Sequence, residues 1–269
     1  EMSVQRFDED TFSLIAAATA QWHDGELLRK NRPDGVTFRD VTREQSTLIV
    51  TGPKSRDVLS GLTDGDLSLG WLTHQPAKVA GRDAMLVRVS FAGELGWEIH
   101  ALNADMPMIY DAVRDAGATP FGMCALNSLR LEKGYRAWKG DLSSDYSLLE
   151  GGLERFVKLD KPQDFPGKAA IQSEKQQGVK KSFVTLKVDA GDADAPYMSC
   201  IYHGDQIVGE TTSGGWGYRV NASIALGMVT AELAVPGTEL EVEIYGHKVR
   251  AVVQQDHPMW DPDNERVRA

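Results

Sequence analysis

The chain has 269 residues, of which 42% are hydrophobic and 25% are charged, and its formal net charge is −10. This composition is typical of a globular protein that is long enough for a sizeable core and for two or three packed units. No segment approaches the roughly 20 apolar residues of a membrane span. The negative charge and the lack of a basic stripe exclude nucleic acid as an expected partner. The six histidines and two cysteines show no metal-ligand or disulfide spacing.

Strands and helices alternate in the first part of the chain. Alternating apolar residues predict strands over residues 2–7 and 11–17, and a helix over residues 23–31 ends at the Arg32-Pro-Asp-Gly35 cluster. Such an alternation indicates an α+β domain with helices on one face of a sheet. Further strands are predicted over 36–41, 46–51, 77–79, 85–90 and 97–101, and further helices over 54–62, 105–116 and 122–133.

The pattern changes near residue 178, after a loop-rich connector and a helix that starts at Phe165-Pro-Gly-Lys168. Short strands separated by glycine-rich turns predict a small antiparallel barrel or sandwich. We therefore expect two domains, residues 1–178 and residues 179–269. The strands of the second domain are predicted over 182–188, 198–203, 206–210, 223–229, 239–244 and 247–254.

The most informative segment is Phe91-Ala-Gly-Glu-Leu-Gly-Trp-Glu98, which follows the predicted strand 85–90. Glycines after a buried strand allow the backbone to approach a ligand closely. A carboxylate held there, Glu94, can accept two parallel N–H bonds from the flat edge of a pterin or a guanine, and such charge-assisted pairs are strong. The alternative is a solvated glutamate in a turn.

Four separated segments, taken in order, resemble one family. The segment around Glu94 resembles the Tyr-Thr-Gly-Glu-x-Gly motif of glycine-cleavage aminomethyltransferases (T-proteins), with Phe91 and Ala92 at the tyrosine and threonine positions. The whole set is similar to the aminomethyltransferase-like C-terminal region of dimethylglycine and sarcosine dehydrogenases and oxidases. The other three segments are Leu129-Arg-Leu-Glu-Lys-Gly-Tyr-Arg-Ala-Trp138 with Leu149-Glu-Gly-Gly-Leu153, then Thr212-Ser-Gly-Gly-Trp-Gly-Tyr218 with Ser223–Val229, and finally His257-Pro-Met-Trp-Asp-Pro-Asp-Asn-Glu-Arg266.

The resemblance implies a fold and a reaction. The fold is a mixed α/β aminomethyltransferase folate-binding domain followed by a small antiparallel β-barrel. The reaction begins on an FAD-containing domain or chain, which oxidises an N-methyl amine. The folate-binding part then captures the carbon on tetrahydrofolate as 5,10-methylenetetrahydrofolate. The flavin-binding Gly-x-Gly-x-x-Gly pattern is absent from this sequence, so we expect FAD on a separate part.

The resemblance also implies roles for particular side chains. Glu94 would accept hydrogen bonds from the pterin, and Phe91 would stack on its face or be a core residue. Arg130 would hold a carboxylate of the folate tail or fix Glu94, and the alternative is an ion pair with Glu132 on the same helix.

Three aromatic residues complete the expected folate site. Tyr135 and Trp138 lie on the segment that faces the ligand in the family, and the alternative is packing between subdomains. Trp216, in the glycine-rich segment Gly214–Gly217, is predicted to lie in a turn. It would cover the ligand or be a packing residue.

The catalytic carboxylate of T-proteins precedes the strand that corresponds to residues 2–7, and the carboxylate at that place here is Glu1. We expect the chain to be a piece of a longer protein, cytoplasmic or, in a eukaryote, in the mitochondrial matrix. Two rival interpretations stay open. The first is a catalytically silent folate-binding or interaction module, and the second is a free-standing aminomethyltransferase or demethylase.

Overall fold

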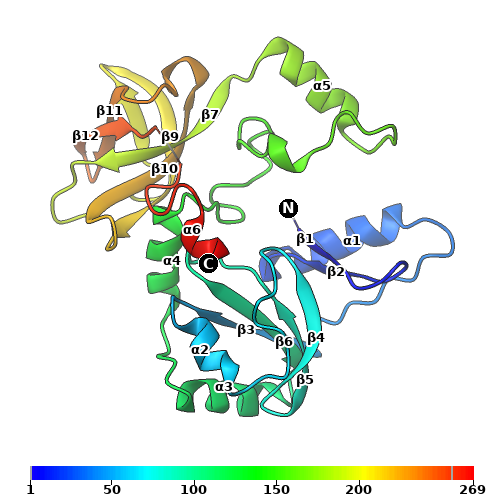
Figure 1. Cartoon of the computed structure of the whole chain (residues 1–269). Helices are drawn as coiled ribbons and strands as arrows, with labels where there is room; N and C mark the ends of the chain where they lie inside the picture. The colour runs from blue at the N-terminus through cyan, green and yellow to red at the C-terminus, as the bar shows by residue number, and fades with distance from the viewer. Residues whose placement is uncertain (1, 256) are drawn as a thin grey trace. The chain divides into compact units, whose positions relative to one another are not determined.

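A computed structural model describes residues 2–255 and 257–269. The chain folds into two compact units (Figure 1). The first contains the chain up to Phe121 together with Asn264–Ala269, and the second contains Gly122–Asp263. Each unit has its own buried apolar core.

The first unit is built on a four-stranded antiparallel sheet. Its strands lie in the order β3 (Gln45–Thr51), β6 (Gly96–Leu102), β5 (Arg82–Val87) and β4 (His74–Val79). Helices α2 (Ser55–Ser60) and α3 (Met106–Asp115) lie beside this sheet (Figure 1). Burial of apolar side chains from both layers stabilises the unit. The fully buried members of this core include Leu59, Leu86, Trp97, Ile99 and Ile109.

The first residues of this unit form a separate hairpin of β1 (Ser3–Arg6) and β2 (Phe12–Ile15), as predicted. The 3₁₀ turn η1 (Ala18–Ala20) and helix α1 (Gln21–Asn31) follow. The strand predicted over residues 36–41 is wrong. The Asp40 carboxylate accepts a hydrogen bond from the backbone N–H of Thr42, so the polar residues of this segment form a turn instead of pairing with a strand.

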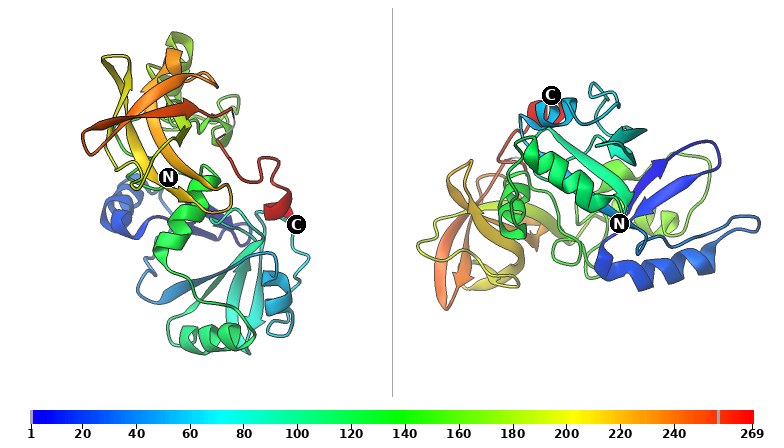
Figure 2. Two further views of the ribbon diagram at one scale, coloured as in Figure 1. Left: turned by 90° about the vertical axis from the view of Figure 1, so that its left-hand side faces the viewer. Right: turned by 90° about the horizontal axis from the view of Figure 1, so that it is seen from below.

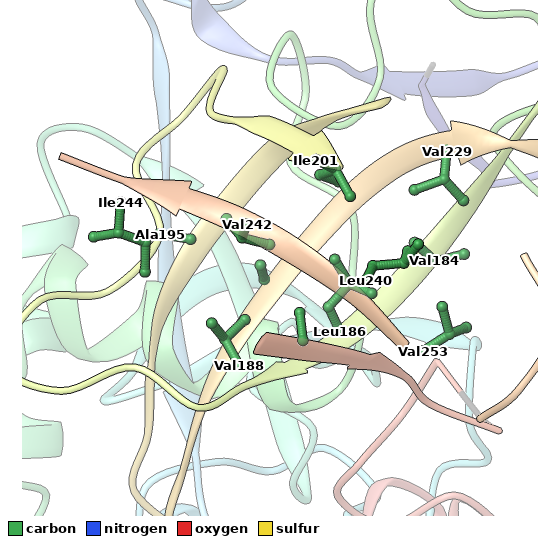
Figure 3. Packing of buried hydrophobic residues seen from close by; sticks show 12 residues of the cluster. Val184, Leu186, Val188, Ala195, Ile201, Val229, Leu240, Val242, Ile244 and Val253 are labelled. Carbon is green, nitrogen blue, oxygen red and sulfur yellow. The ribbon is translucent and has the colours of Figure 1, made fainter. Parts of the chain in front are cut away.

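The second unit contains a closed antiparallel barrel (Figures 1 and 2). Aliphatic side chains from its strands point into a common interior, as Figure 3 shows. The predicted fold class, a mixed α/β domain followed by a small antiparallel barrel, is therefore confirmed. The barrel strands, in spatial order, are β10 (Ala222–Thr230), β7 (Lys181–Val188), β12 (His247–Val253), β11 (Glu239–Ile244), β8 (Cys200–His203) and β9 (Gln206–Gly217).

Strand β10 is buried on both faces, because the barrel interior covers one face and helix α4 (Met123–Glu132) packs near the other. Ile224 and Leu226 belong to a core cluster with Leu131 of α4, whereas Ala225 and Val229 belong to the barrel core. The compact second unit therefore begins at Gly122. The unit also contains η2 (Glu154–Phe156), α5 (Lys168–Gln177) and η3 (Ala231–Leu233), and the last helix, α6 (Glu265–Arg268), belongs to the first unit.

The glycine-rich segment Gly214–Gly217 lies on strand β9 and not in a turn, which corrects the prediction for Trp216. Trp216 pairs with Ser223 across the β9–β10 ladder. The glycines are required by close approach of neighbouring groups, since a Cβ at Gly214 would overlap the backbone oxygen of Ala195. The sequence predicted a turn here because glycine is favoured both in turns and at strand positions where another backbone approaches closely.

We expect Gly214→Ala to lower the free energy of unfolding by about 2–3 kcal/mol, because backbone atoms cannot move aside as a flexible side chain can. Urea-induced unfolding of the full chain measures this change. The matched control is Gly191→Ala, whose added Cβ meets nothing within 4 Å and which should change stability by less than about 0.5 kcal/mol. Equal stability of the two variants would contradict the overlap argument.

Candidate functional site

The candidate site in the first unit is the turn between β5 and β6, residues 88–95. Gly93 adopts a φ of +69°, a conformation that glycine reaches without steric cost. The backbone oxygen of Leu95 accepts hydrogen bonds from Gly52 N (2.8 Å), Thr51 Oγ1 (3.1 Å) and Ser55 Oγ (3.3 Å). This oxygen therefore fixes the end of the turn to strand β3 and the start of helix α2.

The fixed turn sets the exposure of the two predicted ligand contacts. Ala92 and Leu95 are buried at 1% and 3%, whereas the Glu94 side chain between them keeps 13% of its surface exposed. Glu94 Oε2 lies 3.8 Å from Nη1 of Arg266. Phe91 is 37% exposed, so it is not a core phenylalanine. The turn thus presents a largely buried carboxylate next to an accessible aromatic ring.

The other predicted contacts, Arg130, Tyr135, Trp138 and Trp216, lie in the second unit. Arg130 and Asp141 form an ion pair with Nη1 and Oδ2 2.7 Å apart, and both side chains are almost completely buried. The remaining donors of Arg130 bind Asn127 Oδ1, Tyr135 O and Ser213 Oγ. These five hydrogen bonds engage all five N–H groups of a guanidinium.

Asp141 is the acceptor at the centre of this cluster. Besides Arg130, its carboxylate accepts hydrogen bonds from Thr212 Oγ1, Ser213 Oγ and the backbone N–H of Ala137. Burial lowers the pKa of Arg130, and the neighbouring Asp141 opposes that shift. The partner of Arg130 is therefore Asp141 rather than Glu132. The direct ligand contact predicted for Arg130 requires one of its donors to change partner.

Two further ion pairs hold the end of helix α4. The buried Glu132 carboxylate binds the side chain and backbone N–H of Arg219, and Lys133 Nζ lies 3.0 Å from Asp261 Oδ2. The helix ends in a Schellman motif at Gly134, whose φ is +65°. Tyr135 N binds Arg130 O at 3.0 Å, and Gly134 N binds Leu131 O at 2.9 Å.

Two of the predicted aromatic contacts follow helix α4 in the chain, and the third is on strand β9. Tyr135 directly follows Gly134, and burial raises the pKa of its hydroxyl. Trp138 forms an isolated parallel bridge with Leu142. The backbone oxygen of Trp216 accepts a hydrogen bond from Ser128 Oγ at 2.6 Å, which ties β9 to α4. All three are partly buried, and their contact with a ligand stays a prediction.

Sequence reasoning missed Asp141, the acceptor on which Arg130 depends. Asp141 lies in the loop that joins two matching segments, and nothing in its immediate sequence distinguishes it from a solvated loop aspartate. Thr212 and Ser213 were part of a recognised segment but were given no role. The catalytic candidate Glu1 lies outside the described residues. Within residues 2–255 and 257–269, no group of three or more His, Cys, Asp or Glu could hold a metal ion.

Comparison with known proteins identifies the family. The family model "GCVT N-terminal domain" matches residues 1–161, and "Glycine cleavage T-protein C-terminal barrel domain" matches residues 181–261. The chain therefore belongs to the glycine cleavage T-protein family, as the sequence segments predicted. Aminomethyltransferase T of Bartonella henselae has a similar structure, with a TM-score of 0.85 and 25% identity over 97% of this chain and 72% of that chain.

Two curated relatives differ in the share of their length that this chain covers. Mitochondrial dimethylglycine dehydrogenase of Homo sapiens is 36% identical over 279 residues, covering 100% of this chain and 32% of the relative. An aminomethyltransferase of Saccharopolyspora erythraea is 32% identical over 255 residues, covering 93% of this chain and 70% of the relative. The chain thus spans about a third of the first relative. Among the described residues, no helix is long and apolar enough to cross a membrane.

We expect Asp141→Asn to destabilise the protein by about 3–5 kcal/mol, because it leaves the buried Arg130 charge without a compensating carboxylate. Thermal or urea-induced unfolding of the full chain measures the loss. Asp205→Asn is the matched control, since Asp205 is fully exposed and 3.9 Å from Lys248. It should change stability by less than about 1 kcal/mol. If the two variants unfold alike, the ion pair has no structural importance.

Proposed function

We propose that this chain is a tetrahydrofolate-binding, one-carbon-transfer region of an amine-demethylating oxidoreductase of the dimethylglycine or sarcosine dehydrogenase type. The observation that carries the proposal is the Glu94 carboxylate, 13% exposed, on a turn that Leu95 O fixes to two other elements. Family membership and the matching first relative support the same assignment.

The chemistry of the turn fits a reduced pterin. The 2-amino group and the adjacent ring N–H of a pterin are parallel donors, and a carboxylate accepts both. Phe91, 37% exposed and three residues before Glu94, offers an apolar ring for stacking. When bound, tetrahydrofolate supplies the nitrogen atoms that accept a one-carbon unit. The residues of this chain bind and orient it.

In the second unit, three ion pairs support the segment that carries two of the predicted ligand contacts. The ion pairs of Arg130, Glu132 and Lys133 hold the segment of Tyr135 and Trp138 in one conformation. We propose Tyr135, Trp138 and Trp216 as contacts of the ligand, and Arg130 as a residue that holds a carboxylate of the folate tail or supports pterin recognition. Glu1 stays the proposed catalytic carboxylate.

The FAD chemistry is assigned to a separate domain or chain. The human relative is about three times as long as this chain, and the extra length leaves room for a flavin-binding part. We further propose two family domains that meet near residue 178, and a location in the cytoplasm or, in a eukaryote, in the mitochondrial matrix.

A free-standing aminomethyltransferase is the second candidate. It is favoured by the relative from Saccharopolyspora erythraea, of which the chain covers 70%. The mass and the absorbance of the native gene product distinguish the two. A product of about three times the mass of this chain with bound flavin supports the first proposal. A product only somewhat larger than this chain and without flavin supports the second. A silent module would bind folate and transfer no carbon in either form.

We expect Glu94→Gln to weaken tetrahydrofolate binding about 100-fold, because the neutral amide offers one acceptor oxygen and replaces a charge-assisted pair. Isothermal titration calorimetry with the full chain under anaerobic conditions measures the dissociation constants.

Asp83→Asn is the matched control for this titration, since it removes an exposed carboxylate of the same unit, one that pairs with Lys78. It should bind tetrahydrofolate as the unaltered chain does. Unaltered chain that binds no tetrahydrofolate, or a Glu94 variant that binds it equally well, would disprove the proposed function.

A further inference from the structure

The last segment that the chain shares with its family, residues 257–266, has no role in the folate site as proposed above. Its end belongs to the first unit, together with the Glu94 turn. Asn264 adopts a φ of +60°, and helix α6 follows it. Val267 of this helix is fully buried. Residues Asn264–Ala269 are therefore part of the first unit, and Val267 contributes to its buried interior.

A buried arginine fixes this C-terminal segment. Arg88, 1% exposed, donates hydrogen bonds through Nη2 to the backbone oxygens of Val267 and Ala269, each at 2.8 Å. Its Nη1 donates to Gly96 O at 3.1 Å. Because Gly96 begins strand β6, directly after the Glu94 turn, one guanidinium joins α6 to that turn. Arg56 Nη2 adds a hydrogen bond to Ala269 O at 2.8 Å.

This attachment positions Arg266. Its Nη1 lies 3.8 Å from Glu94 Oε2, and its side chain is 52% exposed compared with 13% for Glu94. An ion pair with this exposure adds little to stability. A guanidinium carries five N–H donors, and this one lies 3.8 Å from the carboxylate that would bind the edge of the ligand.

We propose that Arg266 is a specificity-determining residue that binds the 4-oxo group of the pterin while Glu94 binds the 2-amino group and the ring N–H. This inference rests on the proposed function. The edge of a 2-amino-4-oxopteridine presents two donors followed by an acceptor. Glu94 and Arg266 together present the complement, an anionic acceptor followed by a cationic donor. A neutral 2,4-diaminopteridine places an N–H donor against the arginine and lacks the ring N–H that Glu94 would accept. Sites that pair donors with acceptors discriminate strongly against such a change.

The test compares two ligands on the full chain by anaerobic calorimetry. The ligands are tetrahydrofolate and its 4-amino-4-deoxy counterpart, at a pH where the rings of both are neutral. We expect the unaltered chain to prefer tetrahydrofolate. Arg266→Met should weaken tetrahydrofolate binding about ten- to a hundredfold, the loss expected for one charged hydrogen bond. It should leave the 4-amino compound unaffected or bound more tightly, so that the preference narrows by about the same factor. The part of the preference due to Glu94 remains, because the neutral 4-amino ring has no N–H at N3 for that carboxylate.

Arg268→Met is the matched control, because it removes the same charge from another exposed side chain of the same helix and should leave the preference unchanged. Arg266→Lys should recover part of it, since a single ammonium still donates to an oxygen. If Arg266→Met weakens both ligands equally or neither, the inference is overturned while folate binding and its dependence on Glu94 stand. If the unaltered chain binds neither ligand, the proposed function and this inference fail together.

Discussion

The second unit depends on the buried ion pair of Arg130 and Asp141. A guanidinium without a partner in the interior is strongly destabilising, because desolvation removes its hydration and nothing replaces it. Here all five N–H groups have acceptors, and the carboxylate that neutralises them is itself bound by Thr212, Ser213 and a backbone N–H. One interaction thus joins helix α4, the connector after residue 140 and strand β9.

The same principle operates at the end of α4. Glu132 and Lys133 follow Arg130 closely, and each pairs with a different distant segment, through Arg219 and through Asp261. Breaking a buried ion pair of this kind is strongly destabilising, because it leaves a charge without a partner in the interior. The charged residues of the segment Leu129–Trp138 thus connect the end of helix α4 to three other segments of the chain. Tyr135 and Trp138 lie in the part of the chain that these ion pairs hold.

Much of the fold could be predicted from the sequence, and the site only in part. Glycine, proline and apolar periodicity located almost every strand and helix, because these signals act within a few residues. The strand over residues 36–41 was wrong because Asp40 forms a local turn. Strand β9 was predicted too short because glycines that permit close packing look identical to glycines that permit a turn. Glu94 could be proposed from the sequence because its glycine-bounded segment is local and matches a family motif.

The sequence by itself determined the family and the fold class and singled out Glu94 as the candidate ligand contact, since each of these inferences depends on short local segments. Only the tertiary structure decided which charges meet. Asp141 became the partner of Arg130, and Arg266 came within 3.8 Å of Glu94, because burial of Val267 and the donors of Arg88 bring the C-terminal segment onto the first unit. Glu94 and Arg266 are 172 positions apart in the sequence. Whether they meet depends on how the intervening chain folds, and no local sequence pattern can predict that.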